Sequence, residues 1–266
     1  MRRRIAESHS DILNERRGCK VPLYSILVLY NFMKLRIEEK IFEAFPELMI
    51  GVVVAKGVNN VDRVEEVGVL TREQEKRIRA EYVGETLSQT PKINVWRVAY
   101  KMFGVKPHDA KSPVENLYRL ILRGEELKQI NPLVDLYNYI SIKYTLPVGG
   151  EDLDVIQGDL QLVYAGANEP VVKLLGDAEP AAPLAGEIMY RDDVSAICRR
   201  WNWREVERTK LTDKTKNAVI VIESLAPTTR AELESAVAEL QNLVHRCCGG
   251  EVIGAIIDKN KTALEI

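Results

Sequence analysis

Polar side chains recur at a spacing of three residues in one short segment of the chain. Asp135, Asn138 and Ser141 carry a carboxylate, an amide and a hydroxyl, and residues three apart on a helix share one face. The pair Gly149-Gly150 follows closely, and glycine allows backbone N–H groups to approach a ligand. A polar helix face followed by a glycine turn predicts one wall of a binding pocket. For Asp135, however, we favour the holding of a neighbouring backbone group or of Asn138 over chemistry.

The helix that presents these groups is indicated by its start signal and its apolar stripe. Asn131 is a good N-cap, because its side-chain oxygen can accept a hydrogen bond from a free N–H of the first turn. Pro132 suits the first helical position, where no N–H is needed. Apolar residues then recur at helical spacing, as Leu133, Tyr137, Ile140 and Tyr144.

The same segment resembles the B3/B4 module of the bacterial-type phenylalanyl-tRNA synthetase β subunit. The resemblance is carried by Val134-Asp135, Asn138-Tyr139, Pro147 and Asp152. Residues 215–223, with Pro227, resemble the last core strand of that family and the corner after it. The resemblance covers residues 93–258, and no class II catalytic motif of a full synthetase is recognisable. It implies a free-standing module with a layered α/β fold and a sandwich-like core.

The resemblance also implies an activity, because the editing site of that family hydrolyses tyrosine wrongly attached to its tRNA. Glu223 lies near the position of the family's pocket glutamate, although an exposed glutamate at a strand end is the alternative. Two departures stand out. Gly149 replaces a histidine that the family usually has two residues after the turn proline, and Asn202-Trp203 replaces small glycines in a turn. These departures predict a reshaped pocket and a different substrate.

Residues 199–210 combine five basic side chains with two of the three tryptophans of the chain. Guanidinium groups bind phosphates bidentately, and an indole face can stack a nucleobase with about 1–3 kcal/mol. We therefore expect RNA binding by this segment, through the residues Arg199, Arg200, Trp201, Arg204 and Arg208. In the alternative interpretation, one tryptophan belongs to the core and the arginines pair with Glu205 and Glu207.

The composition is that of an ordinary globular protein, with 266 residues, 46% hydrophobic and 29% charged. The net charge of −2 gives no general attraction to nucleic acid, so RNA binding requires a local basic patch. Four cysteines without a C-x-x-C motif favour a reducing cytoplasm. We expect no metal and no cofactor. The fragment His245–Cys248 matches no zinc spacing, and the acidic run at Glu151 matches no calcium loop and favours a solvated loop.

The first 32 residues differ in pattern from the rest. Basic residues 2–4 precede an apolar run at 25–30, but this run is too short to span a membrane and no cleavage site follows. We expect residues 1–32 to be a poorly ordered extension and Met33 to be the biological start. Residues 33–92 are then an N-terminal α/β part of the same domain as the core, residues 93–266. The oligomeric state stays open, and no membrane partner is expected.

The predicted elements follow each other without strict alternation, which favours a mixed, layered α/β (α+β) fold over a doubly wound sheet. Strands are predicted at 34–37, 48–55, 159–164, 171–174, 187–190, 196–201, 217–223 and 251–258. Helices are predicted at 62–84, 93–103, 113–123, from 131 through the opening motif, and from Thr228 or Thr229 to about 245, where Gly249-Gly250 follows. Residues 178–186 are predicted to form a loop, because prolines interrupt strand pairing.

Two functions from different classes fit these residues. The first is a trans-editing hydrolase that cleaves the ester of a mischarged tRNA, with Asn138 and Glu223 as catalytic residues. Its substrate would be bound by the residues Asp135, Tyr137, Ser141, Gly149, Gly150, Asn202 and Trp203. The second is a non-catalytic protein that binds tRNA or an amino acid. The missing histidine at Gly149 favours the second function, whereas the retained polar helix face and the basic-aromatic segment favour the first.

Overall fold

A computed structural model of the chain describes residues 33–266, apart from residues 85 and 107. Residues 1–32, which are expected to form an extension before a start at Met33, lie outside the described residues. The described part is a mixed α/β fold with two sheets and six helices, which confirms the predicted layered fold class. In the part of the chain that is described, no helix has the length and apolar character needed to cross a membrane.

The elements have the following bounds. The strands are β1 (Lys34–Ile37), β2 (Met49–Lys56), β3 (Val148–Asp152), β4 (Leu160–Tyr164), β5 (Ile188–Arg191), β6 (Ala196–Arg199), β7 (Arg204–Glu205), β8 (Asn217–Ser224), β9 (Glu251–Ile257) and β10 (Ala263–Glu265). The helices are α1 (Glu39–Ala44), α2 (Glu65–Glu81), α3 (Pro91–Met102), α4 (Pro113–Leu122), α5 (Pro132–Tyr144) and α6 (Arg230–Cys248).

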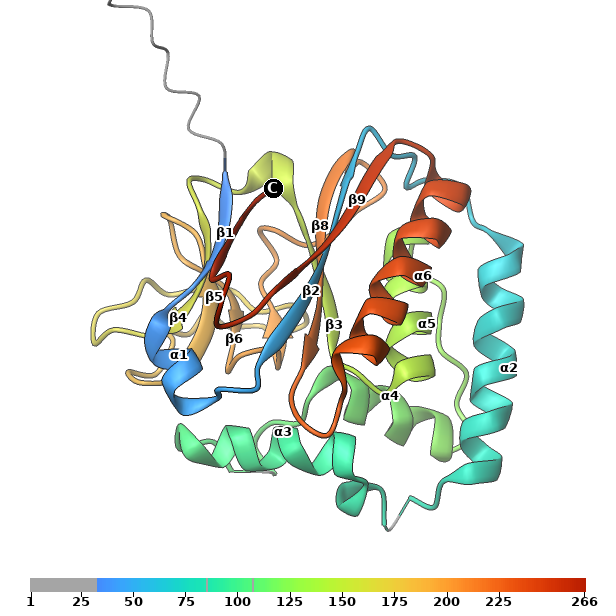
Figure 1. Ribbon diagram of the computed structural model, residues 1–266, viewed down its shortest axis with the longest axis horizontal. Coiled ribbons are helices and arrows are strands. Elements are labelled where there is room, and N and C mark those ends of the chain that lie inside the picture. The colour runs from blue at the N-terminus through green and yellow to red at the C-terminus, as the bar shows by residue number, and fades with distance from the viewer. Residues whose placement is uncertain (1–32, 85, 107) are drawn as a thin grey trace, which may run out of the picture. The chain divides into compact units, whose positions relative to one another are not determined.

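The two sheets face each other and bury a shared apolar core (Figure 1). One sheet has the strand order β10-β1-β4-β5-β6-β7 and the other the order β3-β8-β2-β9. Every strand pair is antiparallel except β1 with β4. Strands β1 and β2 come from residues 33–92 and pair with strands of residues 93–266, which supports the proposal of a single domain.

Strand β2 shows why the four-stranded sheet is covered on both faces. Its apolar run is continuous, as predicted for a strand buried on two sides. Ile50, Val52 and Val54 join the core between the sheets, whereas Val53 and Ala55 join a second core under α5 and α6. The alternation follows from the period of two in a strand. Helix α2 packs outside α5 and completes the layers (Figure 1).

Helix ends agree with the capping signals. The side chain of Asn131 accepts a hydrogen bond from the Val134 N–H at 3.1 Å, and α5 begins directly after it. Thr229 and Glu232 form a capping box at the start of α6, and Gly249 follows its last residue. The predicted caps of both helices are confirmed. Helix α5 therefore begins where the sequence predicts, and it packs against β3.

Some elements differ from the prediction. Residues 171–174 form only isolated bridges, Val172 with Ala181 and Leu174 with Val206, because the preceding Pro170 cannot donate to a ladder. The short elements α1, β7 and β10 were not predicted, since two to six residues give too little periodicity. The prediction of a turn at Gly149-Gly150 was also wrong, because these residues lie inside β3 and pair with β8.

Candidate functional site

A cavity of about 270 Å³ lies between the facing surfaces of the two sheets. It is lined mainly by apolar side chains and backbone, with a small number of polar groups that converge on it. Such a cavity has the character of a small-molecule site, since a few placed polar groups can orient a ligand within an apolar enclosure. Its polar groups come from strands β3, β5, β6, β7 and β8, from helices α4 and α5, and from the turn after β6.

The wall formed by the four-stranded sheet follows from strand register. Gly149 lies opposite Val221, and Glu151 lies opposite Val219 in the pairing of β3 with β8. Directly opposed residues share a face of the sheet, and Glu223 shares that face because it is two residues from Val221. All five residues line the cavity. Glu223 is therefore not at an exposed strand end, and its side chain is 1% exposed.

The opposite wall is a row across three neighbouring strands. Tyr190 on β5 pairs with Cys198 on β6, and Cys198 pairs with Glu205 on β7. These side chains point into the cavity together with Asn202 and Trp203 from the turn between β6 and β7. A phenol, a thiol, an amide and a carboxyl thus face the carboxyls of the other sheet.

Glu223 is held by hydrogen bonds that cross the space between the sheets. The Tyr190 hydroxyl donates to its Oε1 atom at 2.8 Å, and the Asn202 amide donates to its Oε2 atom. Tyr100 on α3 donates in turn to the Asn202 Oδ1 atom at 2.6 Å, which fixes the orientation of the amide. Burial raises the pKa of Glu223 to about 7, although these donors oppose the shift. The carboxyl can therefore gain or lose a proton near neutral pH.

Two further carboxyls, Glu151 and Glu205, line the cavity on either side of Gly149. A Cβ atom at Gly149 would lie 3.3 Å from the Glu205 Oε1 atom, so the missing side chain makes room for this carboxyl. Burial raises the pKa of Glu205, and burial together with the charge of Glu205 raises the pKa of Glu151. Neither residue was predicted as part of the site. Glu151 was wrongly assigned to a solvated loop, and Glu205 was considered only as a partner for arginine.

Cys198 lies near all three carboxyls, and burial together with their charges raises the pKa of its thiol. The group therefore stays a neutral thiol near pH 7, which argues against a nucleophilic thiolate. Among the described residues, no group of three or more His, Cys, Asp or Glu side chains is arranged to hold a metal ion.

Helix α5 contributes two of its predicted residues to the cavity. Tyr137 is buried and Asn138 is partly exposed, and both line it. Asp135 and Ser141 are not among the lining residues. The Asp135 carboxylate accepts a hydrogen bond from the Ile130 N–H at 2.8 Å, and the Ser141 hydroxyl donates to the Leu146 carbonyl at 2.6 Å. The favoured role of Asp135, holding a neighbouring backbone group, is confirmed.

The turn after β6 separates its two tryptophans. Trp201 is fully buried and packs edge-on against Phe45 and Trp96, with ring centroids 4.9 and 5.3 Å away. Its face is thus unavailable for stacking on a nucleobase, contrary to the expectation that it binds RNA. Arg200 and Trp201 have φ angles of 49° and 67°, in the left-handed region that favours glycine. This conformation sends Trp201 inward and leaves Trp203 partly exposed beside the cavity.

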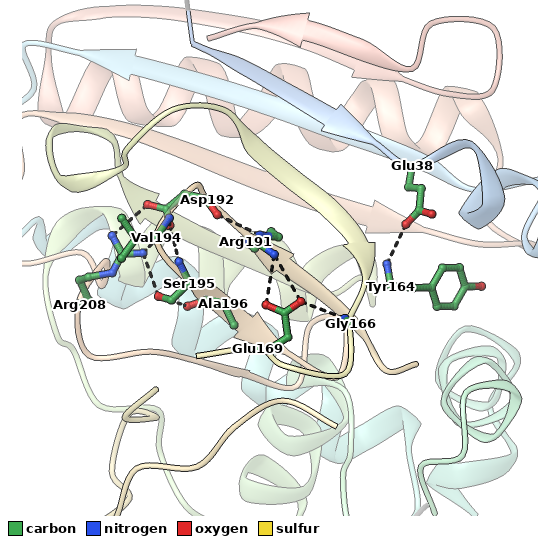
Figure 2. Close-up of polar contacts among 10 residues, drawn as sticks. All are labelled: Glu38, Tyr164, Gly166, Glu169, Arg191, Asp192, Val194, Ser195, Ala196 and Arg208. Carbon is green, nitrogen blue, oxygen red and sulfur yellow. Dashed lines mark hydrogen bonds and ion pairs between the residues drawn. The ribbon is translucent and has the colours of Figure 1, made fainter. Parts of the chain in front are cut away.

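Most of the arginines expected to bind RNA are held by carboxylates. Arg199 is buried and makes two hydrogen bonds to Glu187, at 2.9 and 3.0 Å. The Arg208 guanidinium donates two hydrogen bonds to the Asp192 carboxylate, at 2.8 and 3.0 Å (Figure 2). Arg204 pairs with Asp177. The alternative interpretation that these arginines pair with acidic residues is therefore confirmed for Arg199, Arg204 and Arg208. The partners that it named, Glu205 and Glu207, are wrong.

Arg200 differs from these arginines. Within the described residues it makes no ion pair, and its guanidinium donates to the Asp109 carbonyl at 3.3 Å. The Trp203 ring lies between two guanidinium groups, with Arg200 at 4.4 Å and Arg204 at 4.5 Å from its centroid. Both contacts have the geometry of cation–π interactions. The exposed part of the basic-aromatic segment is thus this stack of Arg200, Trp203 and Arg204, at the edge of the cavity.

Comparison with known proteins identifies the domain to which this site belongs. A family model described as the B3/4 domain matches residues 95–249. The phenylalanine–tRNA ligase beta subunit of Fusobacterium nucleatum subsp. nucleatum is 25% identical over 161 residues. The match covers 52% of this chain but only 20% of that subunit. The resemblance predicted for residues 93–258 is confirmed, and it concerns one module of a much longer protein.

The buried state of Glu223 predicts a dependence of stability on pH. Its pKa is raised from 4.5 to about 7, so the folded state binds more protons than the unfolded state between these values. Stability from this group therefore falls as pH rises from 4.5 to 7, by a total on the order of 3 kcal/mol. We expect Glu223→Gln to remove this fall. Urea unfolding between pH 4 and pH 8 measures the free energy of unfolding of both proteins. The value for the variant should rise relative to that of the parent as pH increases. Parallel plots of the free energy of unfolding against pH would contradict the assignment.

Proposed function

This chain belongs to the B3/4 domain family, and we propose that it is a trans-editing aminoacyl-tRNA hydrolase. In this proposal it cleaves the ester between an amino acid and the terminal ribose of a mischarged tRNA, which it would meet in the cytoplasm. The observation that carries the proposal is Glu223, a buried carboxyl with a pKa of about 7 in a cavity of about 270 Å³. A group that titrates near the working pH is well suited to general base catalysis.

The proposed reaction follows from the position of this carboxyl. The charged form of Glu223 takes a proton from a water molecule, whose oxygen attacks the ester carbonyl carbon. The bond from that carbon to the ribose oxygen then breaks, and the ribose oxygen receives a proton from Glu223. The products are a free amino acid and a tRNA with its terminal hydroxyl restored. Tyr190 and Asn202 support the charged state of Glu223, because both donate hydrogen bonds to it.

Helix α5 would orient the ester beside this base. Asn138 lines the cavity, and no hydrogen bond of its side chain is found among the described residues. Its amide group is therefore available to a ligand, and it can donate to a carbonyl oxygen as well as accept. Tyr137 lies next to it and supplies an apolar ring to the same wall. In this proposal Asn138 positions the ester and does not transfer a proton.

The end of the tRNA would reach the cavity past the stack of Arg200, Trp203 and Arg204. Trp203 is partly exposed, but the guanidinium groups of Arg200 and Arg204 already lie over its ring, so a nucleobase would stack on a guanidinium plane of this stack and not on the indole itself. Arg200 has no acidic partner among the described residues and is therefore free to approach a phosphate. With a net charge of −2, binding would depend on this local group and not on the charge of the whole molecule.

A second function, binding without catalysis, is favoured by one observation. Both oxygens of Glu223 already accept hydrogen bonds, from Tyr190 and Asn202, as expected of a carboxyl that recognises a ligand or stabilises the site. Gly149 also leaves the site without the imidazole that the resemblance implies. A protein of this kind would bind an aminoacyl-tRNA or an amino acid in the same cavity and release it unchanged.

Deacylation assays distinguish these functions. Purified protein should release amino acid from at least one member of a panel of aminoacyl-tRNAs. Glu223→Gln, which preserves shape and removes the base, should lower that rate by about 10²–10⁴-fold. A parent protein that binds some members and cleaves none would support the binding function. A Gln variant with full activity would leave hydrolysis assisted by the ribose hydroxyl as the enzymatic explanation.

Asn138→Ala tests the positioning role of α5. Asn138 is partly exposed and makes no side-chain hydrogen bond in the described part, so the free energy of unfolding should change by less than about 0.5 kcal/mol. The rate of deacylation, or the affinity for ligand, should fall. Asn131→Ala is the matched control, because loss of this N-cap should cost about 1 kcal/mol and leave the cavity intact. A large loss of stability in Asn138→Ala would mark Asn138 as structural.

Arg200→Ala tests the proposed RNA contact. If Arg200 neutralises one phosphate, the slope of log affinity against log salt concentration should become shallower by about 1. Arg36→Ala is the control, since Arg36 is exposed on β1 and pairs with Asp159. Binding of labelled tRNA at several salt concentrations measures both slopes. An unchanged slope in Arg200→Ala would place the RNA surface elsewhere on the molecule.

A further inference from the structure

The cavity contains two carboxyls that the proposed reaction does not use. Glu151 and Glu205 both line it, and neither makes an ion pair with any residue in the described part of the chain. The Glu151 Oε2 atom is buried and accepts no hydrogen bond of normal length in the described part of the chain, and the nearby Thr209 hydroxyl, which lowers the pKa of Glu151, is buried without a partner as well. A buried acceptor without a partner is costly, unless a ligand supplies the donor.

The basic side chains around this pair are already held by other acids, and Arg204, which lines the cavity beside Glu205, pairs with Asp177. The charge of Arg208 lowers the pKa of Glu151, but Arg208 makes two hydrogen bonds to Asp192. Lys210 pairs with Glu207 at 2.5 Å. Within the described residues, Glu151 and Glu205 therefore have no ion-pair partner of their own, and Arg208 acts on Glu151 only from a distance. Because burial raises the pKa of both carboxyls, the pair favours sharing a proton, and a bound cation would take the place of that proton.

The backbone at Gly149 brings the pair together. Glu205 lies on β7 of one sheet and Glu151 on β3 of the other, so the two side chains reach toward each other across the cavity. Glu205 comes so close to β3 that a Cβ atom at Gly149 would lie 3.3 Å from its Oε1 atom. A glycine inside a strand often marks such a close approach. The pair thus has a defined place, beside the backbone of Gly149 and Gly150.

We propose that Glu151 and Glu205 form the subsite for the α-ammonium group of the bound aminoacyl ester. This inference rests on the proposed function, and it deepens it by defining the substrate as an ester with a free amine. An ammonium group has three N–H donors and one positive charge, which suit the unpartnered Glu151 oxygen and the facing Glu205 carboxylate. Glu223 then serves the ester, and the acidic pair serves the amine. N-acylated aminoacyl-tRNAs would be excluded from hydrolysis.

Binding of non-hydrolysable analogues tests this subsite independently of turnover. The probes are 3′-aminoacylamino-3′-deoxyadenosines, with the amino acids of the tRNA panel, and the same compounds acetylated on the α-amine. Isothermal titration of the parent protein should show about 10–100-fold tighter binding of the free amine than of its acetylated form. Glu205→Gln should reduce this preference to about threefold or less. Glu207→Gln is the matched control and should preserve it, since Glu207 does not line the cavity.

The outcomes separate this inference from the proposed hydrolysis. Equal affinity of the parent protein for both forms, or binding of neither, would overturn the ammonium subsite even if deacylation occurs. A preference that survives in Glu205→Gln would also overturn it. A preference for the free amine that Glu205→Gln removes, in a protein that cleaves no aminoacyl-tRNA, would support the subsite and reject catalysis. Because the parent protein alone gives the first comparison, the test does not depend on the folding of a variant.

Discussion

The hydrogen bond from Tyr190 to Glu223 is the contact on which the site depends, because it joins the two sheets inside their common core. A carboxyl buried there needs donors, and this need fixes the elements that supply them. Tyr190 comes from β5, Asn202 from the turn after β6, and Tyr100 from α3 behind Asn202. Three segments that are distant in sequence are therefore held in fixed positions around Glu223. The left-handed backbone at Arg200 and Trp201 is part of the same constraint, since it directs Asn202 toward the carboxyl while Trp201 enters the core.

Local signals predicted much of the fold, and they failed where the cause was another part of the chain. The cap at Asn131, the cap at Thr229 and the apolar run of β2 depend on neighbouring residues, so the sequence was sufficient. Gly149-Gly150 was predicted as a turn because glycine weakens a strand. In the structure the glycines occur in β3 because side chains of other elements occupy the space, as Leu211 does 3.0 Å from a Cβ atom at Gly150. No residue close to Gly150 in the sequence indicates that Leu211 packs against it.

The same reason explains which site residues the sequence revealed. Periodicity on α5 revealed Asn138, but not that Asp135 and Ser141 of the same face turn to backbone groups, and Glu223 was indicated by the family resemblance; Asn138, Tyr137 and Glu223 all line the cavity. Glu205 lies on a strand of two residues, so its direction depends on the pairing with Cys198 and not on any pattern. The arginines of the basic-aromatic segment were visible, but their partners were not. Glu187, Asp192 and Asp177 lie 12, 16 and 27 residues away in sequence, and they leave Arg200 as the arginine of this group without an acidic partner among the described residues.

The close approach of Glu205 to Gly149 has a consequence for how such a site can change over time. Position 149 and position 205 lie on different sheets, yet their side chains meet in one volume, so a side chain much larger than alanine at position 149 would displace the Glu205 carboxyl. A functional group can then pass from one sheet to the other by two substitutions, with the cavity wall and both strands retained. The chemistry of the pocket is thus not tied to a particular strand. Descendants of one ancestral domain could come to carry different acids or bases at the same point in space, and position-by-position comparison of their sequences would record this as a loss.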